Sequence, residues 1–593
     1  MRNLPIMMNS SNLLRTLRLG KLLRLLCLFP IVSLMTITAH AESGSEGTAE
    51  GIDKNINSFL TPISDWAGKI VFYPVPIAGQ NVPIVLILLA GTAIFLTLYF
   101  KFINVRSFGT ALKTVKGRYT SADAPGQITH FQALSAALSA TVGLGNIAGV
   151  AVAIGLGGPG ATFWMILMGL FGMTTKFCEC TLGVKYRKID SEGKVHGGAM
   201  YYLRQGFSDR GFPTIGKILA VFFALMCIGG AFGAGNMFQV NQAHDQFART
   251  FDILHEGWQF GLVLGIMVGL VIIGGIVWIA RVTSFLVPFM CVSYIIAALV
   301  IIIGNIEALP GAFAIIIKGA FSPEAVGGGT VGGIIVVMIQ GVKRAAFSNE
   351  AGLGSAPIAH AAVKTDHPAS EGMVALLEPF VDTVVVCTMT ALVIIITGVW
   401  NVNGDVENNA ASLVAQPNAE ALVVSTLEPG SMIHIVSRQP ADSPEWYEVT
   451  VKDSEQKGWV AADSITLREG WGGGIWLTSM AFKSVISWFP IVLAAAVFLF
   501  AFSTMISWSY YGQQAVVYLF GAEHKVAIGI YKVVFCLVAV LGGAASLESV
   551  LNLSDAMVFA MVLPNLIGVY FLLPVIKKEL AIFRKHVADT EGK

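Results

Sequence analysis

A hydrophobic segment interrupted by glycine constrains the fold of this chain more than any other feature. Residues Ser139 to Gly160 read SATVGLGNIAGVAVAIGLGGPG and lie within an apolar stretch long enough to cross a bilayer. At its middle, VGLGN places Gly143 and Gly145 on either side of one leucine and ends in Asn146. Glycine weakens a helix, and freed backbone groups persist in a membrane only where protein or a water-filled cavity satisfies them. The segment therefore predicts a helix that breaks near the membrane midplane, as in secondary transporters.

The composition predicts an all-α membrane protein with many spans. Of the 593 residues, 55% are hydrophobic and 13% are charged, whereas soluble domains carry about 25% charged residues. The formal net charge of +1 gives no electrostatic reason to expect a nucleic-acid partner. The sequence has no nucleophile–base constellation, and its GLGGPG stretch lacks the Lys-Ser/Thr of a phosphate-binding loop. These patterns argue against an enzyme.

The first 41 residues have the three parts of a signal peptide. A basic region precedes an apolar core at 25–39, and Ala39-His40-Ala41 fits a small-x-small cleavage site. The alternative is an uncleaved first span, for which the apolar core is short. We therefore predict a signal peptide at 1–41 and an exported N-terminal segment at 42–81.

Eleven apolar stretches have the length of membrane spans. The first stands apart, and the other ten form two sets of five, 131–304 and 331–576. Sets with an odd number of spans have opposite orientations, which is the geometry of an inverted repeat. The first span of each set should then be broken, and in the second set Gln340 and Gly341 mark the expected break. The predicted spans are 82–103, 131–156, 161–184, 215–240, 260–280, 284–304, 331–349, 373–400, 474–503, 526–543 and 556–576.

Loop charges predict the orientation of these spans. Lys and Arg are frequent in 104–130, 185–213 and the tail 577–593, and sparse in 241–259 and 305–330. Basic loops stay on the cytoplasmic side. The N-terminus is thus expected outside, the C-terminal tail in the cytoplasm, and the protein in a bacterial inner membrane surrounded by lipid.

Residues 401–473 divide the spans into a core part of eight at 82–400 and a part of three at 474–576. This insert alternates like short strands, separated by turn signals such as EPG and SPE. It holds four Lys or Arg against eleven Asp or Glu, and the predicted topology places it outside. Its WYEV and GWV stretches resemble those of bacterial Src-homology-3-like domains, which implies a small β-barrel. A cell-wall or periplasmic partner and a ligand-free spacer are equally compatible with it.

Several longer motifs carry a wider resemblance. They are SATVGLGNIAGVA, TKFCECTLGVKYR, GGAMYYL, LVPFM, KRAAFSNEAGLGSAPIAHAA, PFVDTVVVCTMTALVIIITG and FAFST. From about Asp53 to the last span, apart from the insert, the chain resembles the alanine or glycine:cation symporter family. The resemblance implies a leucine-transporter-type fold and uptake of a small neutral amino acid with co-transported Na⁺. A sensor with the same fold and an H⁺-coupled transporter are the alternatives.

VGLGN also resembles the broken first helix of the neurotransmitter:sodium symporters, and this resemblance implies roles for single residues. The amides of Leu144 and Gly145 would hold the substrate carboxylate at a positive half-helix end, with Thr141 beside the substrate. One Na⁺ would bind the Asn146 side-chain oxygen and the Thr141 carbonyl. A second would bind two carbonyls and two hydroxyls, those of Ser139, Val142, Ser503 and Thr504. Back-bonding of the two hydroxyls to their own helix is the alternative.

Polar residues in the other spans complete the predicted site. Gln340 and Gly341 are expected at the substrate, with Gln340 facing its ammonium group or joining two helices. Glu179 is expected to accept freed backbone N–H groups, or else to pair with Lys176 three residues earlier. Asp382 is expected to be a second brace or a helix-packing residue.

Overall fold

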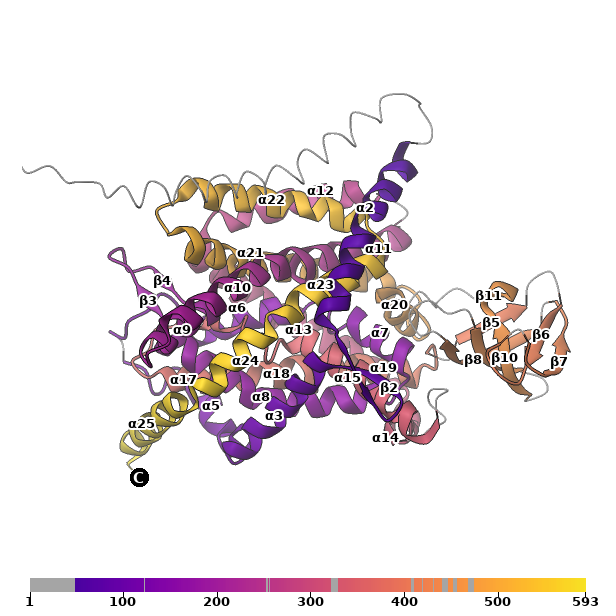
Figure 1. The fold of residues 1–593 in the computed structure, drawn as a ribbon, viewed down its shortest axis with the longest axis horizontal. Coiled ribbons are helices and arrows are strands. Elements are labelled where there is room, and N and C mark those ends of the chain that lie inside the picture. The colour runs from indigo at the N-terminus through magenta and orange to yellow at the C-terminus, as the bar shows by residue number, and fades with distance from the viewer. Residues whose placement is uncertain are drawn as a thin grey trace, which may run out of the picture.

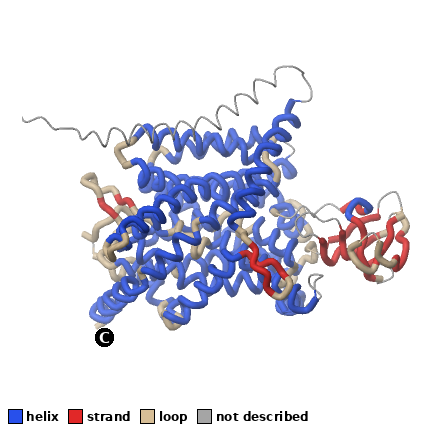
Figure 2. The backbone as a smooth tube through the Cα atoms, in the orientation of Figure 1, coloured by secondary structure: helices blue, strands red, loops and turns tan. Residues whose placement is uncertain are grey.

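The computed structural model describes most of the chain after residue 47 as a helical bundle with a small β unit at one end (Figures 1 and 2). The predicted signal peptide lies outside the described residues. These are 48–592 without 122, 252–253, 255, 322–328, 401, 407–409, 419, 430, 440–445, 452–455 and 468–473.

Two long helices precede the first predicted set. Helix α2 (Thr48–Val71) leads through the hairpin β1 (Pro74–Ile77) and β2 (Gln80–Pro83) into α3 (Ile84–Tyr99). Short helices α4 (Ile103–Arg106) and α5 (Phe108–Val115) follow. Helix α2 packs along α23 (Leu547–Ala560) of the second set, so this N-terminal segment is part of the bundle.

The first set contains five helical crossings, of which the first is broken. Its helices are α6 (His130–Thr141) and α7 (Ala148–Gly157), α8 (Ala161–Lys185), α10 (Pro213–Phe232) with η1 (Gly233–Met237) and α11 (Phe238–Phe251), α12 (Gly257–Ile272), and α13 (Gly275–Gly304). The segment η1 is π-helical and joins α10 to α11 without a break in the run. Between α8 and α10 lie β3 (Lys188–Ile189), β4 (Val195–His196) and α9 (Ala199–Ser208).

The second set repeats this pattern after η2 (Ile306–Ala308) and α14 (Leu309–Phe321). It consists of α15 (Gly329–Asn349) and α16 (Pro357–His360), a run of α17 (Pro368–Ala375), α18 (Leu377–Pro379), η4 (Phe380–Cys387) and α19 (Thr388–Ile396), then α21 (Phe489–Phe520), α22 (Lys525–Ala544), and α23 (Leu547–Ala560) with α24 (Val562–Phe571). Helix α25 (Leu573–Glu591) ends the chain. Like η1, η4 is π-helical.

Equivalent helices of the two sets pack against each other. Helix α8 contacts α17, α10 contacts α21, and α12 runs along α22. Seven helical runs among the described residues are long and apolar enough to cross a membrane, and Ile84–Tyr99, Ala148–Gly157 and Gly257–Ile272 are shorter apolar helices. The predicted all-α membrane fold, with one span before two sets of five and a broken helix at the start of each set, is confirmed.

Several predicted spans are shifted along the chain. The turn expected at 281–283 lies between α12 and α13 at 273–274, and the last span begins at Leu547 rather than at 556. One predicted span joins two separate helices. Residues 474–503 contain a separate helix, α20 (Ile475–Lys483), and only the first half of α21. The chain turns between them, and Pro490 stands in the first turn of α21, where its missing N–H costs nothing. The hydropathy pattern did not separate the two helices, because both are apolar. The crossing helix is α21, and Ser503 and Thr504 lie in its middle rather than at the end of a span.

The insert is a β unit with its own core. Its strands are β5 (Val402–Val406), β6 (Ala411–Val414), β7 (Val423–Leu427), β8 (Met432–Gln439), β9 (Trp446–Val451), β10 (Lys457–Ala461) and β11 (Ile465–Leu467). They form one antiparallel sheet in the order β11-β5-β8-β9-β10-β6-β7, with Tyr447 opposite Val460. In the described residues its end strands β11 and β7 are not paired, so the sheet is not a closed barrel. The Src-homology-3 likeness stays a prediction.

The insert and the C-terminus lie at opposite ends of the bundle. Figure 1 shows α14, α20 and the insert at one end, and α9, the β3–β4 hairpin and α25 with the C-terminus at the other. At the second end, residues just before α6 join residues just after α16 through a parallel bridge between Ile128 and Val363. We refer to these two ends as the insert end and the C-terminal end.

Candidate functional site

The first break occurs where the VGLGN motif predicts it. Helix α6 ends at Thr141 and α7 begins at Ala148. Within the gap the Gly143 N–H donates to Asn146 Oδ1 at 2.9 Å, and the Leu144 N–H donates to Gln239 Oε1 at 3.2 Å. Side chains thus satisfy backbone donors that a continuous helix would satisfy itself.

Glycine is required at position 143 by the close approach of α21. A Cβ atom built there would overlap Thr504 Oγ1 and lie 3.2 Å from Gln239 Oε1. Gly145 faces α15, where a Cβ would lie 3.5 Å from Ser348 Cα and 3.6 Å from Phe347 Cδ1. The break is therefore packed on both sides by other broken or polar helices.

The second break lies ten residues later than the sequence suggested, so the prediction of a break at Gln340 and Gly341 is wrong. Helix α15 continues to Asn349, and left-handed backbone at Glu350 (φ 57°), Gly352 (φ 93°) and Gly354 (φ 78°) then interrupts it. Gly341 is small for another reason. A Cβ there would lie 2.5 Å from the Ala161 carbonyl oxygen, so it allows α15 to approach α8.

A carboxylate cluster joins the two breaks; it consists of Asn146, Ser348, Asp382 and Thr383, and we call it the Asp382 cluster. Asp382 lies in η4, and its Oδ1 accepts from Asn146 Nδ2 at 2.6 Å. Its Oδ2 accepts from Ser348 Oγ at 2.8 Å and from Thr383 Oγ1 at 2.7 Å. All four side chains are buried. Among the described residues, no Lys, Arg or His forms a salt bridge with Asp382.

The hydroxyls of FAFST lie on the other side of the first break. Ser139 Oγ donates to the Ser503 carbonyl at 2.7 Å, and Ser503 Oγ donates to the Phe500 carbonyl at 3.0 Å. Ser503 thus forms the back-bond given above as the alternative. Thr504 Oγ1 is buried and has no hydrogen-bond partner in the described part of the chain. Seven other buried hydroxyls of the described residues also lack a partner, so Thr504 is distinguished by its place against Gly143 in the first break.

A small enclosed pocket lies beside the first break. It encloses about 10 Å³, the space of a single water. Trp508 Nε1 donates to Glu350 Oε1 at 3.0 Å, and Ser355 Oγ donates to Glu350 Oε2. The lining residues are Ala140, Thr141, Gly145, Ala234, Gln239, Phe347, Glu350, Leu353, Trp508 and Val558.

The pocket collects only some of the predicted substrate residues. Thr141 and Gly145 line it, and Leu144 adjoins it through its bond to Gln239. Gln340 and Gly341 do not line it, because they pack on Gly157 and on the start of α8.

Sequence reasoning missed Gln239, Ser348, Glu350 and Trp508 as members of this site. Each is a polar or amphipathic residue within an apolar run, and Ser348 and Glu350 stand inside the SNEAGLG stretch. That signal was present in the sequence. Which of many such residues meet at one point depends on tertiary structure.

Glu179 lies at the second break. Its Oε1 accepts the Gly354 N–H at 3.1 Å and an N–H of Asn565. Lys176 instead binds Glu378 Oε1 at 2.9 Å, and this ion pair joins α8 to α18.

Two cations of α15 meet one carboxylate of α23 on the insert side of the second break. Lys343 Nζ lies 3.0 Å from Asp555 Oδ2, and Arg344 binds the same oxygen. The Lys343 ammonium also lies 4.6 Å from the centre of the Phe72 ring. These contacts hold α15, α23 and the segment after α2 together.

Comparisons with known proteins agree with the motifs. The model of the sodium:alanine symporter family matches residues 75–428 and 461–593. The chain is 39% identical over 503 residues to the sodium/alanine symporter AgcS of Methanococcus maripaludis, covering 85% of this chain and 94% of that protein. It is 30% identical over 538 residues to the amino-acid carrier protein AlsT of Bacillus subtilis, covering 90% and 94%. The crystal structure of MhsT in complex with L-phenylalanine aligns with 75% of this chain and 88% of its own at 15% identity and a TM-score of 0.47.

Proposed function

Because the chain belongs to the sodium:alanine symporter family, we propose that it imports a small neutral amino acid, alanine or glycine, together with Na⁺ by alternating access. Membership in a symporter family makes the protein a transporter rather than an enzyme. The observation that carries the proposal is the meeting of two helix breaks at one pocket, with an oxygen-rich cluster beside it.

The Asp382 cluster fits a dehydrated Na⁺. It offers carboxylate and hydroxyl oxygens, which are donors that hard cations prefer. The Asn146 amide would have to turn its oxygen away from the Gly143 N–H to join them. A buried carboxylate without a basic partner is costly, and a bound cation offsets that cost. Asn146, predicted as an ion ligand, and Asp382, predicted as a brace, would thus serve one ion.

A second Na⁺ would bind between α6 and α21. The Thr504 hydroxyl lies beside the first break and has no hydrogen-bond partner among the described residues. The Ser503 hydroxyl keeps its acceptor lone pairs after donating to the Phe500 carbonyl. Ser139 lies in the last turn of α6 and Val142 is its C-cap, where carbonyls lose their helical partners and would be available to the ion. Alanine and this ion would therefore share one helix break, which couples their binding.

The pocket would hold the amino acid itself. The Gly145 amide would bind its carboxylate, joined by the Leu144 amide once that N–H leaves Gln239. The Glu350 carboxylate or the Gln239 amide would face its ammonium group. Phe347 and Trp508 restrict the space for a side chain. Since the pocket is smaller than alanine, its lining must move to admit the substrate, and this requirement favours the smallest amino acids.

The closures at the two ends support alternating access. On the insert side, Lys343 and Arg344 bind Asp555. On the C-terminal side, the Ile128–Val363 bridge joins the two broken helices. Opening one closure while the other stays shut would expose the pocket to one side of the membrane at a time.

The orientation follows from the charges. The basic loops and α25 share the C-terminal end, opposite the insert (Figure 1). The positive-inside rule then favours a cytoplasmic C-terminal end and an exported insert.

The ion gradient supplies enough energy for accumulation. One Na⁺ crossing a potential of ~150 mV releases roughly 3.5 kcal/mol, at about 2.3 kcal/mol per 100 mV. A tenfold Na⁺ gradient adds about 1.4 kcal/mol. Each ion would thus support accumulation on the order of a thousandfold.

Uptake of labelled alanine into proteoliposomes tests the function. An inward Na⁺ gradient should drive uptake, and replacement of Na⁺ by K⁺ should abolish it. Uptake driven by a pH gradient without Na⁺ would identify H⁺ as the coupling ion. Alanine binding without uptake under any gradient would favour a sensor.

A further inference from the structure

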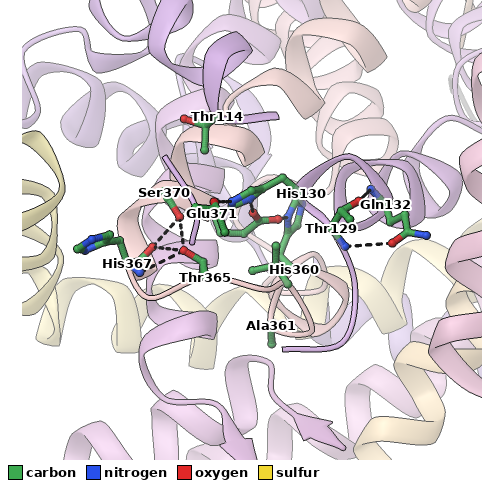
Figure 3. A network of polar contacts seen from close by, with 12 residues as sticks. Thr114, Thr129, His130, Gln132, His360, Ala361, Thr365, His367, Ser370 and Glu371 are labelled. Atoms are coloured by element: carbon green, nitrogen blue, oxygen red, sulfur yellow. Dashed lines mark hydrogen bonds and ion pairs between the residues drawn. The ribbon is translucent and has the colours of Figure 1, made fainter. Parts of the chain in front are cut away.

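A chain of buried titratable side chains crosses the C-terminal half of the bundle, away from the pocket. It consists of His130, Glu371, His360, Glu378 and Lys176, and we call it the His360 chain. His130 Nδ1 binds Glu371 Oε2, and His360 Nδ1 lies 2.5 Å from Glu371 Oε1 (Figure 3). His360 Nε2 lies 3.5 Å from Glu378 Oε2, and Glu378 Oε1 binds Lys176 Nζ at 2.9 Å. Each of the five side chains is at most 3% exposed.

The positions of the nitrogens assign a proton to His360. Its Nδ1 faces one carboxylate and its Nε2 faces another. A neutral imidazole has only one N–H, so one of its nitrogens would direct a lone pair at a carboxylate oxygen. The imidazolium directs one N–H at Glu371 and places the other nitrogen 3.5 Å from Glu378, a contact that is electrostatic rather than a hydrogen bond in the described residues. The second nitrogen of His130 lies 2.7 Å from Thr120 Oγ1, a hydroxyl that can donate or accept, so this contact assigns no proton to His130.

Charge balance gives the same assignment. With His360 protonated, the two cations Lys176 and His360 balance the two carboxylates Glu371 and Glu378. Without that proton, the buried chain has an excess negative charge, which is costly at this depth. The other titratable or charged groups that face the chain are Glu179, Cys180, Arg187, Glu350 and Tyr511. Glu179 and Glu350 add two carboxylates and Arg187 adds one cation, so the whole group still has more acidic than basic side chains without the His360 proton.

The chain fastens the closure at the C-terminal end. His130 is the first residue of α6, and its bond to Glu371 ties α6 to α17. The Ile128–Val363 bridge and the bond of Arg187 Nη1 to the Ala361 carbonyl, 2.9 Å, act beside it. If α6 moves to open this end, the His130–Glu371 contact must break and water can reach Glu371, which screens the attraction that holds the proton on His360.

The same end gives access to solvent. Thr120, the partner of His130, is only partly buried in the loop before α6. The His, Cys, Asp and Glu side chains of the described residues form no group of three or more suited to a metal ion. The chemistry of the chain therefore points to a proton as its ligand.

We propose that His360 is a proton-binding site, distinct from the ion and substrate sites, which holds a proton while the C-terminal end is closed and releases it to that side when the end opens. This proposal takes from the proposed alternating access only the statement that the C-terminal end opens and closes. It makes the inner closure responsive to the pH of the compartment that faces the C-terminal end.

Proton exchange by the purified full-length protein provides the test. Na⁺ and alanine are added to protein in lightly buffered K⁺ medium containing a pH dye, and binding of labelled alanine is measured in parallel. We expect the number of protons bound by the wild type to change by on the order of one per molecule when Na⁺ and alanine open or close the C-terminal end. The dye reports this change as proton release or uptake. The variant His360→Gln should exchange less than about a fifth of that amount, since an amide does not titrate.

His196→Gln is the matched control. His196 lies at the same end and pairs with Asp190 outside the chain, so this variant should exchange as many protons as the wild type. Equal exchange by His360→Gln and the wild type, or no exchange by a wild type that binds alanine, would overturn the proposal. Loss of Na⁺-dependent alanine binding in the wild type would instead refute the proposed transport function. If His360→Gln does not fold, Glu371→Gln tests the same point, because it removes the carboxylate that both imidazoles share.

Proteoliposomes separate a local proton from a co-transported one. With the C-terminal side facing inward, the uptake rate should follow the internal pH in the wild type and in His196→Gln, and not in His360→Gln. A dependence of equal size on the external pH would overturn release to the C-terminal side.

Discussion

Replacing Gly143 by alanine tests the proposed second Na⁺ site, because Gly143 packs directly against Thr504, one of its proposed ligands. The added Cβ would overlap Thr504 Oγ1, the hydroxyl without a hydrogen-bond partner, and approach Gln239 Oε1 to 3.2 Å. Thr504 must therefore turn away, or the break must widen. Either change displaces a proposed Na⁺ ligand.

The size of the effect follows from the crowding. One extra methyl in a tightly packed site costs about 1–3 kcal/mol, which corresponds to a loss of roughly 5- to 150-fold in affinity. We expect Gly143→Ala to raise the Na⁺ concentration for half-maximal alanine uptake within this range. Gly155→Ala is the matched control, because a Cβ at Gly155 has no neighbour within 4 Å, and its effect should be below about twofold.

A double-mutant cycle identifies the atom responsible. Thr504→Ala removes the hydroxyl and should itself weaken Na⁺ dependence. In that background Gly143→Ala should add less than about 0.5 kcal/mol, because the principal overlap is gone. Additive losses in the double variant would refute the argument, as would a Gly143→Ala protein with normal Na⁺ dependence.

Three further predictions concern topology, the insert and the substrate. A cysteine at the exposed Thr426 should react with an impermeant thiol reagent in intact spheroplasts; reaction only after lysis would reverse the orientation. Replacing 405–469 by a short Gly/Ser linker should leave uptake within a fewfold of normal, because the insert has a separate core; complete loss in a normally inserted protein would make it part of the transport machinery. Gly145→Leu should abolish alanine binding, since its side chain must extend past Phe347, and wild-type affinity in this variant would place the substrate elsewhere.

The first break was predictable because its cause is local. Two glycines and an asparagine within six residues cannot sustain a helix without outside partners, and the structure supplies Gln239 as one of them. The second break was misplaced because glycine has more than one use. Gly341 interrupts an apolar run as Gly145 does, but it serves close helix packing. The sequence shows where a glycine stands, but the packing around it determines whether it breaks a helix or allows two helices to approach closely.

The remainder of the site depends on contacts distant in sequence. Trp508 and Glu350 are separated by 158 residues, and Asn146 and Asp382 by 236. The sequence marked Asp382 as costly in a membrane, which was sufficient to select it. It did not reveal that the hydroxyls of Ser348 and Thr383 both bind this carboxylate, because the π-helical turn of η4 changes which residues face inward.

The π-helical segments η1 and η4 also bear on how these helices tolerate a change in length. Each contains a wider turn than its flanking α-helices, and Gln239 lies just after η1 while Asp382 and Thr383 lie within η4. An α-helix advances about 100° per residue. Removing one residue from η4 could restore regular α-helical turns, yet it would rotate all of α19 by about that angle relative to Asp382. Such a deletion would make the helix more regular but would turn the buried face of α19 toward lipid. The π-helical turn of η4 therefore sets the rotation of α19 relative to the part of the span that carries Asp382.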